Sequence, residues 1–193
     1  MECDVTNPTS VSAVVSQIEQ EVGYIDVLIN NAGTLGPDQK AMYNAETIED
    51  LQSILLNNWE GWESAFALNA SAIAGMSAAF LKLLDAGNQR RGWQGGKLAA
   101  GETRRRETAE QLAAKGIDAD DSRSSQIITT GSIAGLNKFA TVGLPYGGSK
   151  AAAIHLSKML AHLLAPWGIR SNVINPGGEL AHCSRLKDVN PLI

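Results

Sequence analysis

A tyrosine and a lysine four residues apart are the pair in this chain whose types and spacing suit acid–base chemistry. Tyr146 and Lys150 stand at the head of an alanine-rich run, residues 151–165, which has the composition of a helix. Residues four apart lie on one face of a helix, so the phenol and the ammonium group come close together. A free phenol ionises at about pH 10, but a nearby positive charge favours the phenolate. The pair therefore predicts a tyrosine that acts as a general acid or base at neutral pH.

The same pair has an ordinary structural explanation, in which Tyr146 caps a core helix and Lys150 is a solvated surface side chain. Because the pattern is short and both residue types are common, the pair alone does not establish catalysis. Three other stretches each follow an apolar run and give the pair a context. They are Asn30-Asn31-Ala32-Gly33, Gly131-Ser132 and Asn175-Pro176-Gly177. A turn after a strand explains the composition of each stretch taken singly.

Together and in this order, the four stretches resemble the short-chain dehydrogenase/reductase family, over a region that runs from Met1 to about Gly177. The resemblance implies an oxidoreductase that interconverts a carbonyl and an alcohol by hydride transfer with NADP or NAD. Two segments, 146–150 and 168–177, look most like the branch of the family that includes the 3-oxoacyl-carrier-protein reductases.

The resemblance also implies roles for single residues. Tyr146 would be the general acid or base and Ser132 would hold the substrate oxygen. Lys150 would lower the pKa of the tyrosine and hold the nicotinamide ribose. Asn69 would hold a water in the proton relay, although a polar residue on an exposed helix face is the simpler alternative. The implied cofactor-binding residues are Asp4, Val5, Asn31, Ala32, Gly33, Tyr146, Lys150, Pro176 and Gly177.

The hydrophobic pattern predicts helices and buried strands in alternation, which is typical of an α/β fold. Short apolar runs predict parallel strands at 25–29, 126–130 and 169–174, and 1–5 resembles the end of another strand. A proline in a first turn starts a helix at 7–9, and further helices are predicted over 46–56, 59–84 and 146–165. We expect an incomplete doubly wound, Rossmann-like parallel sheet with helices on both faces.

One part of the family pattern is absent from the sequence. The glycine-rich fingerprint that binds the pyrophosphate of a dinucleotide occurs nowhere in the chain. By resemblance, the chain lacks the first two strands and the C-terminal strand, and no threonine follows Gly177 where relatives have one. We therefore expect weak cofactor binding and impaired closure over the substrate. We also expect sheet edges and apolar faces that a partner would cover.

Residues 88–124 break the apolar periodicity and carry eight Lys/Arg against six Asp/Glu. This composition predicts a solvated polar insertion, with a surface helix over 102–115, inside a single truncated domain of residues 1–193. A contact with a partner or carrier protein through Arg104 to Arg106 is the sharper alternative.

The overall composition excludes several classes of protein. A chain of 193 residues with 44% hydrophobic residues and a net charge of −4 suits one soluble domain and offers no basic field for nucleic acid. Asn69 and Lys82 interrupt the apolar stretch 64–84, which favours a core or interface helix over a membrane span. Two cysteines predict neither a disulfide framework nor a metal centre. With no leader pattern, a cytoplasmic location is expected.

Three functions stay open from the sequence. The oxidoreductase ranks first because the four catalytic positions occur in the order of the family. The second is a cofactor-independent, redox-neutral enzyme, such as an isomerase, dehydratase or cyclase, which would use the same Ser/Tyr/Lys pocket. The third is a noncatalytic partner subunit. In relatives the helices that match 64–84 and 146–165 form the dimer interface, so a homodimer or tetramer is expected.

Overall fold

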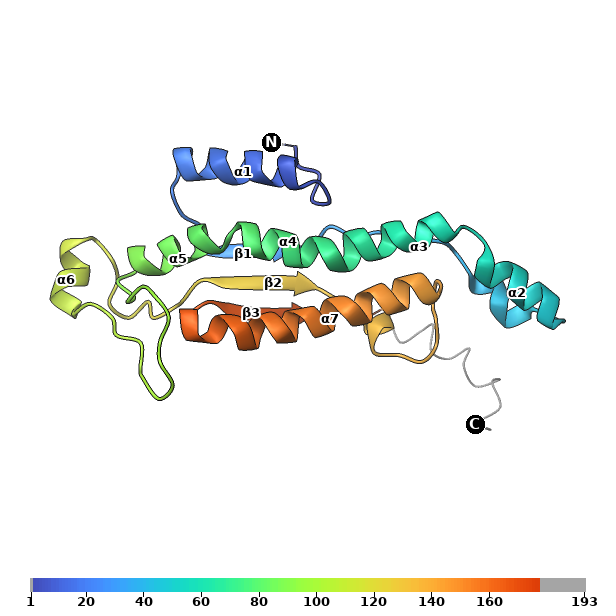
Figure 1. The fold of residues 1–193 in the computed structure, drawn as a ribbon. Coiled ribbons are helices and arrows are strands. Elements are labelled where there is room, and N and C mark those ends of the chain that lie inside the picture. Colours follow the sequence, from blue (N-terminus) through green and yellow to red (C-terminus); the bar gives the residue numbers. More distant parts are fainter. Residues whose placement is uncertain (1, 178–193) are drawn as a thin grey trace.

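The computed structural model describes residues 2–177 (Figure 1). The helices are α1 Pro8–Glu21, α2 Ile48–Leu56, α3 Trp59–Phe66, α4 Ala72–Ala79, α5 Leu81–Arg90, α6 Ala109–Ala114 and α7 Leu144–Leu164. The strands are β1 Val27–Asn30, β2 Gln126–Thr130 and β3 Arg170–Ile174. Three short 3-10 turns cover Lys40–Asn44, Ile133–Gly135 and Ala165–Trp167, and a π-helical turn covers Ala67–Ser71.

The three strands form one parallel sheet in the order β1-β2-β3. Leu28 of β1 lies opposite Ile127 of β2, and Ile127 lies opposite Ser171 of β3. Because all three strands are parallel, their carboxyl ends meet at one edge, which is where α/β proteins bind ligands. The predicted α/β class with a parallel sheet is confirmed, and all three predicted strands are present.

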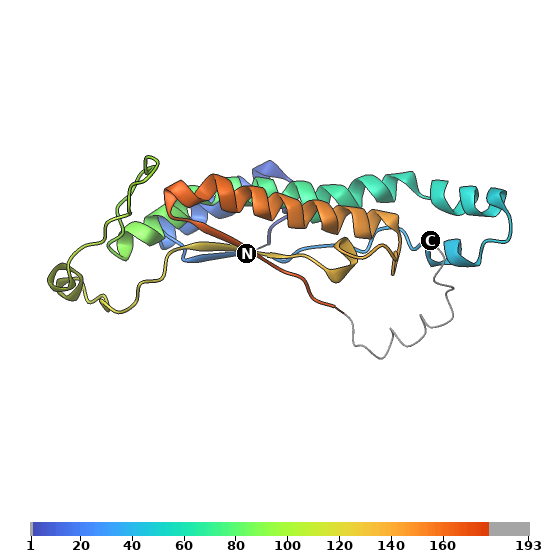
Figure 2. The same ribbon diagram turned by 90° about the horizontal axis from the view of Figure 1, so that it is seen from below.

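Within residues 2–177, the helices that pack on the sheet cover only one of its faces, whereas helices on both faces were predicted. Figures 1 and 2 show α4 and α7 side by side over the strands, with α1 beyond α4. This face carries the apolar core, which includes Leu28, Leu83, Leu84, Ile127 and Leu164. On the opposite face Val27, Ile29 and Ile174 are exposed, Ile29 by 60%.

The chain enters α1 through a turn rather than from a strand. The predicted strand end at 1–5 is wrong for residues 2–5, because the Asp4 carboxylate accepts the N–H and O–H of Thr6 and bends the chain there. The predicted helix start is confirmed: Asn7 accepts the N–H groups of Thr9 and Ser10, and Pro8 occupies the first turn.

The helix predicted over 59–84 is continuous as far as Ala79 and is broken once. A π turn joins α3 to α4, and a bend of 48° at Phe80 separates α4 from α5. No single helix of the described chain is long and apolar enough to cross a membrane; the bent pair Trp59–Ala79 and Leu81–Arg90 meets only the length and composition criteria together. Both segments contribute buried core residues, among them Ile73, Leu83 and Leu84.

The polar segment 88–124 has more structure at its ends than predicted. Helix α5 runs to Arg90, and Asn88 is buried: its Oδ1 accepts the Ser125 N–H at 2.7 Å and its Nδ2 donates to the Gly168 carbonyl at 3.0 Å. The predicted surface helix over 102–115 is reduced to α6. Asn88 is therefore part of the core that joins α5 to β2, and it does not belong to a loop.

Two of the three consecutive arginines fold this segment on itself. The Arg106 guanidinium donates to four backbone carbonyls, those of Arg91, Asp118, Ala119 and Asp121. Arg104 donates to the carbonyls of Gln94, Gly96 and Pro166. Of the three arginines, only Arg105 is exposed. The predicted alternative of a partner contact through Arg104 to Arg106 therefore has one available cation in place of three.

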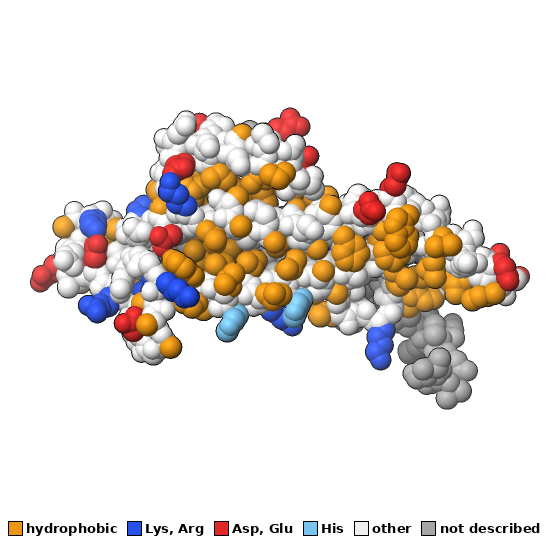
Figure 3. Space-filling view, viewed as in Figure 1, with side chains coloured by type: hydrophobic (Ala, Val, Ile, Leu, Met, Phe, Trp, Pro, Cys, Tyr) orange, Lys and Arg blue, Asp and Glu red, His pale blue; other side chains and the backbone are white. Residues whose placement is uncertain are grey.

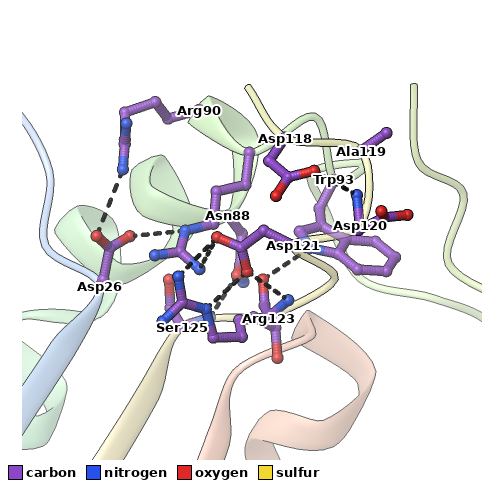
Figure 4. Close-up of polar contacts among 12 residues, drawn as sticks. Asp26, Asn88, Arg90, Trp93, Asp118, Ala119, Asp120, Asp121, Arg123 and Ser125 are labelled. Carbon is purple, nitrogen blue, oxygen red and sulfur yellow. Dashed lines mark hydrogen bonds and ion pairs between the residues drawn. The ribbon is translucent and has the colours of Figure 1, made fainter. Parts of the chain in front are cut away.

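Ion pairs fasten the same segment to the start of β1. Arg90 and Arg91 both pair with Asp26, and Arg91 also reaches Asp121 at 3.5 Å (Figure 4). Hydrogen bonds from Arg123 hold the pKa of Asp121 well below its ordinary value, with the Arg91 charge acting in the same direction. The network positions the loop that leads into β2.

Candidate functional site

A cleft of about 300 Å³ lies at the carboxyl edge of the sheet and brings the four sequence motifs together. The loop after β1, the turn after β2, the first turns of α7 and the segment after β3 each supply part of its wall. The lining residues are Asn31, Gly33, Thr34, Leu35, Thr130, Gly131, Ser132, Tyr146, Lys150 and Pro176.

Lys150 is buried in the wall of this cleft. Its side chain is on the second turn of α7, and its Nζ donates to the Thr130 carbonyl at 2.7 Å. The Thr130 hydroxyl in turn donates to Asn31 Oδ1 at 3.0 Å, which links the ends of β1 and β2. Burial lowers the pKa of Lys150 because it disfavours the charged ammonium. A solvated surface lysine, the ordinary alternative, is wrong here.

Tyr146 lies half-buried on the first turn of α7 and faces the same cleft. Its hydroxyl forms no hydrogen bond with a side chain or backbone group of residues 2–177, so it can bond to a molecule in the cleft. Tyr146 and Lys150 therefore share one cavity, as the spacing predicts.

Ser132 lies two residues past the end of β2 and is buried. Its Oγ accepts the Ala134 N–H at 3.1 Å, which starts the turn Ile133–Gly135 and leaves the hydroxyl proton for a ligand. A Cβ at Gly131 would overlap Asn175 Oδ1, so glycine is needed for the end of β2 to pack against the segment after β3. This packing fixes the place of Ser132.

Asn69 lies behind the cleft, in the π turn, and is fully buried. Its Oδ1 accepts the Thr34 N–H at 2.8 Å, and its Nδ2 donates to the Thr34 carbonyl at 2.8 Å and to Ser149 Oγ at 2.9 Å. Ser149 donates to the Tyr146 carbonyl at 3.0 Å. The exposed-face alternative for Asn69 is wrong, because one amide ties the cleft loop to the helix that carries Tyr146.

The other sequence-predicted cofactor residues divide into three groups. Gly33 and Pro176 line the cleft; a Cβ at Gly33 would lie 2.9 Å from Asn69 Oδ1 and 3.5 Å from Lys150 Nζ. Val5 and Ala32 line a separate cavity of about 50 Å³ beside β1, which Asn31 also borders. Neither cavity includes Asp4 or Gly177. Across the part of the chain that is described, no three potential metal ligands lie together.

Sequence reasoning missed several residues that shape the site. Thr34, Leu35 and Ser149 directly follow or lie within recognised motifs, so their positions carried a signal. The position of Thr130 also carried a signal, because this residue ends a predicted strand. Gln39, described below, had none, because its contacts are far away in the sequence.

Comparisons with known proteins relate the chain to one protein family. The family model described as short chain dehydrogenase matches residues 1–93 and 106–186. The chain is 31% identical over 181 residues to short-chain dehydrogenase/reductase SAT3 of Stachybotrys chartarum and 33% identical over 182 residues to VdtF of Byssochlamys spectabilis. Each alignment covers 92% of this chain but only 60% and 56% of the respective relative.

A solved structure agrees on the fold. The Pseudomonas aeruginosa RhlG/NADP active-site complex superposes with a TM-score of 0.62 at 22% identity, over 99% of this chain and 57% of that one. The predicted likeness to 3-oxoacyl-carrier-protein reductases is distant, since FabG of Escherichia coli is 26% identical. The chain belongs to the short-chain dehydrogenase/reductase family.

Proposed function

We propose that this cleft interconverts a carbonyl and an alcohol by hydride transfer with a nicotinamide cofactor, and that Tyr146 is its general acid or base. The observation that carries the proposal is the convergence of Ser132, Tyr146 and Lys150 on one cleft, with Asn69 directly behind it. Membership of a family whose relatives are named dehydrogenases and reductases supports it.

Each side chain has a task that its surroundings allow. Ser132 donates its hydroxyl proton to the substrate oxygen, and Tyr146 gives that oxygen a proton in reduction or removes one in oxidation. Lys150, fixed through Thr130, presents its ammonium group to the same cavity. Asn69 acts at a distance from substrate, because its amide holds the loop at Thr34. In the family pattern it also holds a water of the proton relay.

The cleft suits the nicotinamide and ribose half of the cofactor. Gly33 keeps the floor open, Lys150 and Asn31 offer polar groups to a ribose, and Pro176 gives an apolar wall. A bound nicotinamide would supply or accept the hydride. Two similar folds were solved with such cofactors, RhlG with NADP and the reductase A1-R′ with NAD.

The described residues do not suit the diphosphate half. A helix N-terminus with free amides usually holds that group, yet the Asn7 side chain already bonds the first-turn amides of α1. No glycine-rich loop precedes a helix of the described chain in the fingerprint pattern. We infer that the cofactor binds through its nicotinamide half and only weakly to this chain alone.

Replacement of Tyr146 by phenylalanine tests the assignment. NADPH or NADH consumption with a panel of ketones and 3-oxoacyl thioesters should fall by at least about a hundredfold in Tyr146→Phe, the usual contribution of a general acid or base. Tyr24→Phe is the matched control, because Tyr24 lies beside Arg90 outside the cleft. Retained turnover in Tyr146→Phe would contradict the proposal, and turnover that needs no nicotinamide would select the redox-neutral alternative.

A further inference from the structure

Gln39 is a buried polar residue near the site that the proposed chemistry does not use. Only 1% of the residue is exposed, and it does not line the cleft. Its Oε1 accepts the Leu144 N–H at 3.0 Å, and its Nε2 faces the Leu55 carbonyl at 3.4 Å. Its backbone N–H donates to the Val142 carbonyl at 2.8 Å. One side chain thus serves the last turn of α2 and the first residue of α7.

Helix α7 has no cap of its own. The residue at its N-cap position is Gly143, which has no side chain to accept the amides of the first turn, and Pro145 has no N–H. The Leu144 N–H therefore depends on Gln39, which lies 105 residues earlier in the chain. A side-chain oxygen on a first-turn N–H is how serine or asparagine caps a helix locally. Here the cap comes from the loop that follows β1.

The packing at Gly143 shows why a local cap is excluded. A Cβ at this position would lie 2.8 Å from the Pro37 carbonyl oxygen and 3.2 Å from Gln39 Oε1. A serine or aspartate at residue 143 would push away the loop that carries Gln39. Glycine at residue 143 and glutamine at residue 39 therefore form one arrangement.

We propose that Gln39 is a positioning residue for Tyr146, which it serves by keeping the first turn of α7 wound. Tyr146 is the third residue of α7, whereas Lys150 is on the next turn and is held separately by Thr130. Loss of the cap loosens the first turn and displaces the phenol, while Lys150 keeps its place. The catalytic consequence rests on the proposed function; the structural consequence does not.

Hydrogen exchange tests the structural part without a substrate. The Gly147 and Gly148 amides bond across the first turn, the former to the Gly143 carbonyl at 3.2 Å. In Gln39→Met these two amides should exchange roughly fivefold to tenfold faster, the effect of a lost cap, and amides beyond Ala153 should be unchanged. Gln52→Met, an exposed glutamine on α2, is the matched control. Equal protection of Gly147 and Gly148 in wild type and Gln39→Met would overturn the proposal.

Two further variants keep the test decisive if Gln39→Met folds poorly. At mildly acidic pH, where a glutamate in this buried site is protonated, Gln39→Glu keeps an acceptor for the Leu144 N–H and a donor for the Leu55 carbonyl. It should then retain nearly wild-type exchange at Gly147. Leu144→Pro removes the N–H at a helix position that tolerates proline. Adding Gln39→Met to Leu144→Pro should then change exchange at Gly147 less than twofold. A full additional effect in the double variant would show that Gln39 acts through some other contact.

Kinetics separate this inference from the proposed function. If the chain reduces a carbonyl, Gln39→Met should lower kcat about tenfold with little change in KM for cofactor, and it should add nothing in a Tyr146→Phe background. A rise in KM for cofactor with unchanged kcat would overturn the positioning role. No turnover by wild type would refute the proposed function, while the exchange result would still decide the role of Gln39 as a cap.

Discussion

Side chains that hold backbone groups give the site its shape at the scale of single residues. The Asn69 side-chain amide bonds both backbone groups of Thr34 and donates to Ser149 Oγ. The Ser149 hydroxyl in turn donates to the Tyr146 carbonyl. Lys150 holds the carbonyl of Thr130 at the end of β2. The polar groups around the cleft are therefore fixed before any ligand arrives, which is the condition for efficient proton transfer and electrostatic stabilisation.

Truncation of Asn69 should destabilise the protein strongly. Asn69→Ala leaves the two backbone groups of Thr34 without a buried partner and removes the donor to Ser149 Oγ. A buried polar group without a partner costs on the order of 1–3 kcal/mol. We expect the free energy of unfolding to fall by about 3 kcal/mol in urea denaturation. Asn137→Ala, at an exposed loop position, is the control. A loss below about 0.5 kcal/mol in Asn69→Ala would show that these bonds are not made.

The buried lysine should make stability depend on alkaline pH. The folded-state pKa of Lys150 is below its ordinary value of 10.5, so the unfolded chain binds more protons over the range just below pH 10.5. Stability contributed by this residue must therefore rise with pH in that range. Wild type and Lys150→Met should be compared by their free energies of unfolding at pH 8, 9 and 10. As the pH rises, the free energy of unfolding of wild type should increase relative to that of Lys150→Met. A difference independent of pH would contradict the burial of a titrating ammonium.

At the scale of elements, loops between strands and helices do most of the positioning. The loop after β1 supplies Asn31, Gly33 and Thr34 to the cleft and then Gln39 to the start of α7. The π turn lets α3 and α4 continue past Asn69 while its amide points to that loop. Helix α7 contributes to the cleft through its first two turns, and its later turns pack on β3.

The polar segment offers a precise deletion at this scale. Trp93 and Arg106 form an antiparallel bridge, and the Gln94 N–H donates to the Arg105 carbonyl, so a hairpin starts here. The family model omits residues 94–105. Replacement of 94–105 by Asn-Gly, a two-residue hairpin turn, should change the free energy of unfolding by less than about 1 kcal/mol.

A calorimetric scan of the Asn-Gly variant checks this expectation. Asn88→Ala is the contrasting variant, because it leaves the Ser125 N–H and the Gly168 carbonyl without their partner and should cost about 2 kcal/mol. Unfolding of the Asn-Gly variant at a much lower temperature than wild type would show that residues 94–105 support the domain through Pro166.

The sequence predicted those elements whose signal is local. Strands at 126–130 and 169–174 are short apolar runs between polar residues, and α7 is a long alanine-rich segment with proline at each end. The bend at Phe80 and the burial of Asn88 depend on contacts with distant segments, so no local sequence pattern predicted them. For the same reason the cleft motifs could be predicted as a set, while Gln39 could not.

At the scale of the whole molecule, the described chain has large apolar surfaces. Figure 3 shows hydrophobic side chains along the face that α4 and α7 share, and Met159 and Leu163 of α7 are exposed. Trp59 and Phe66 of α3 are exposed as well. The uncovered face of the sheet, with Val27, Ile29 and Ile174, is a second one. Surfaces of this kind favour association.

We propose that α7 and α3–α4 pair two copies of the chain. A charge at the centre of such an interface should weaken association by about a hundredfold, so Leu163→Glu should shift a dimer or tetramer toward monomer in analytical ultracentrifugation. Val22→Glu, at an exposed apolar position after α1, should leave the mass unchanged. A monomeric wild type, or an unchanged mass in Leu163→Glu, would contradict this pairing.

The nicotinamide site is tested most directly by a fluorescence titration of the folded chain with NADPH, NADH and reduced nicotinamide mononucleotide. We predict saturable binding by wild type and by Lys158→Met, an exposed lysine on the same helix, and at least tenfold weaker binding by Lys150→Met. The mononucleotide should bind nearly as well as NADPH, because the cleft suits the nicotinamide half. A folded wild-type chain that binds none of the three, or binds them equally well without Lys150, would contradict the assignment of this cleft.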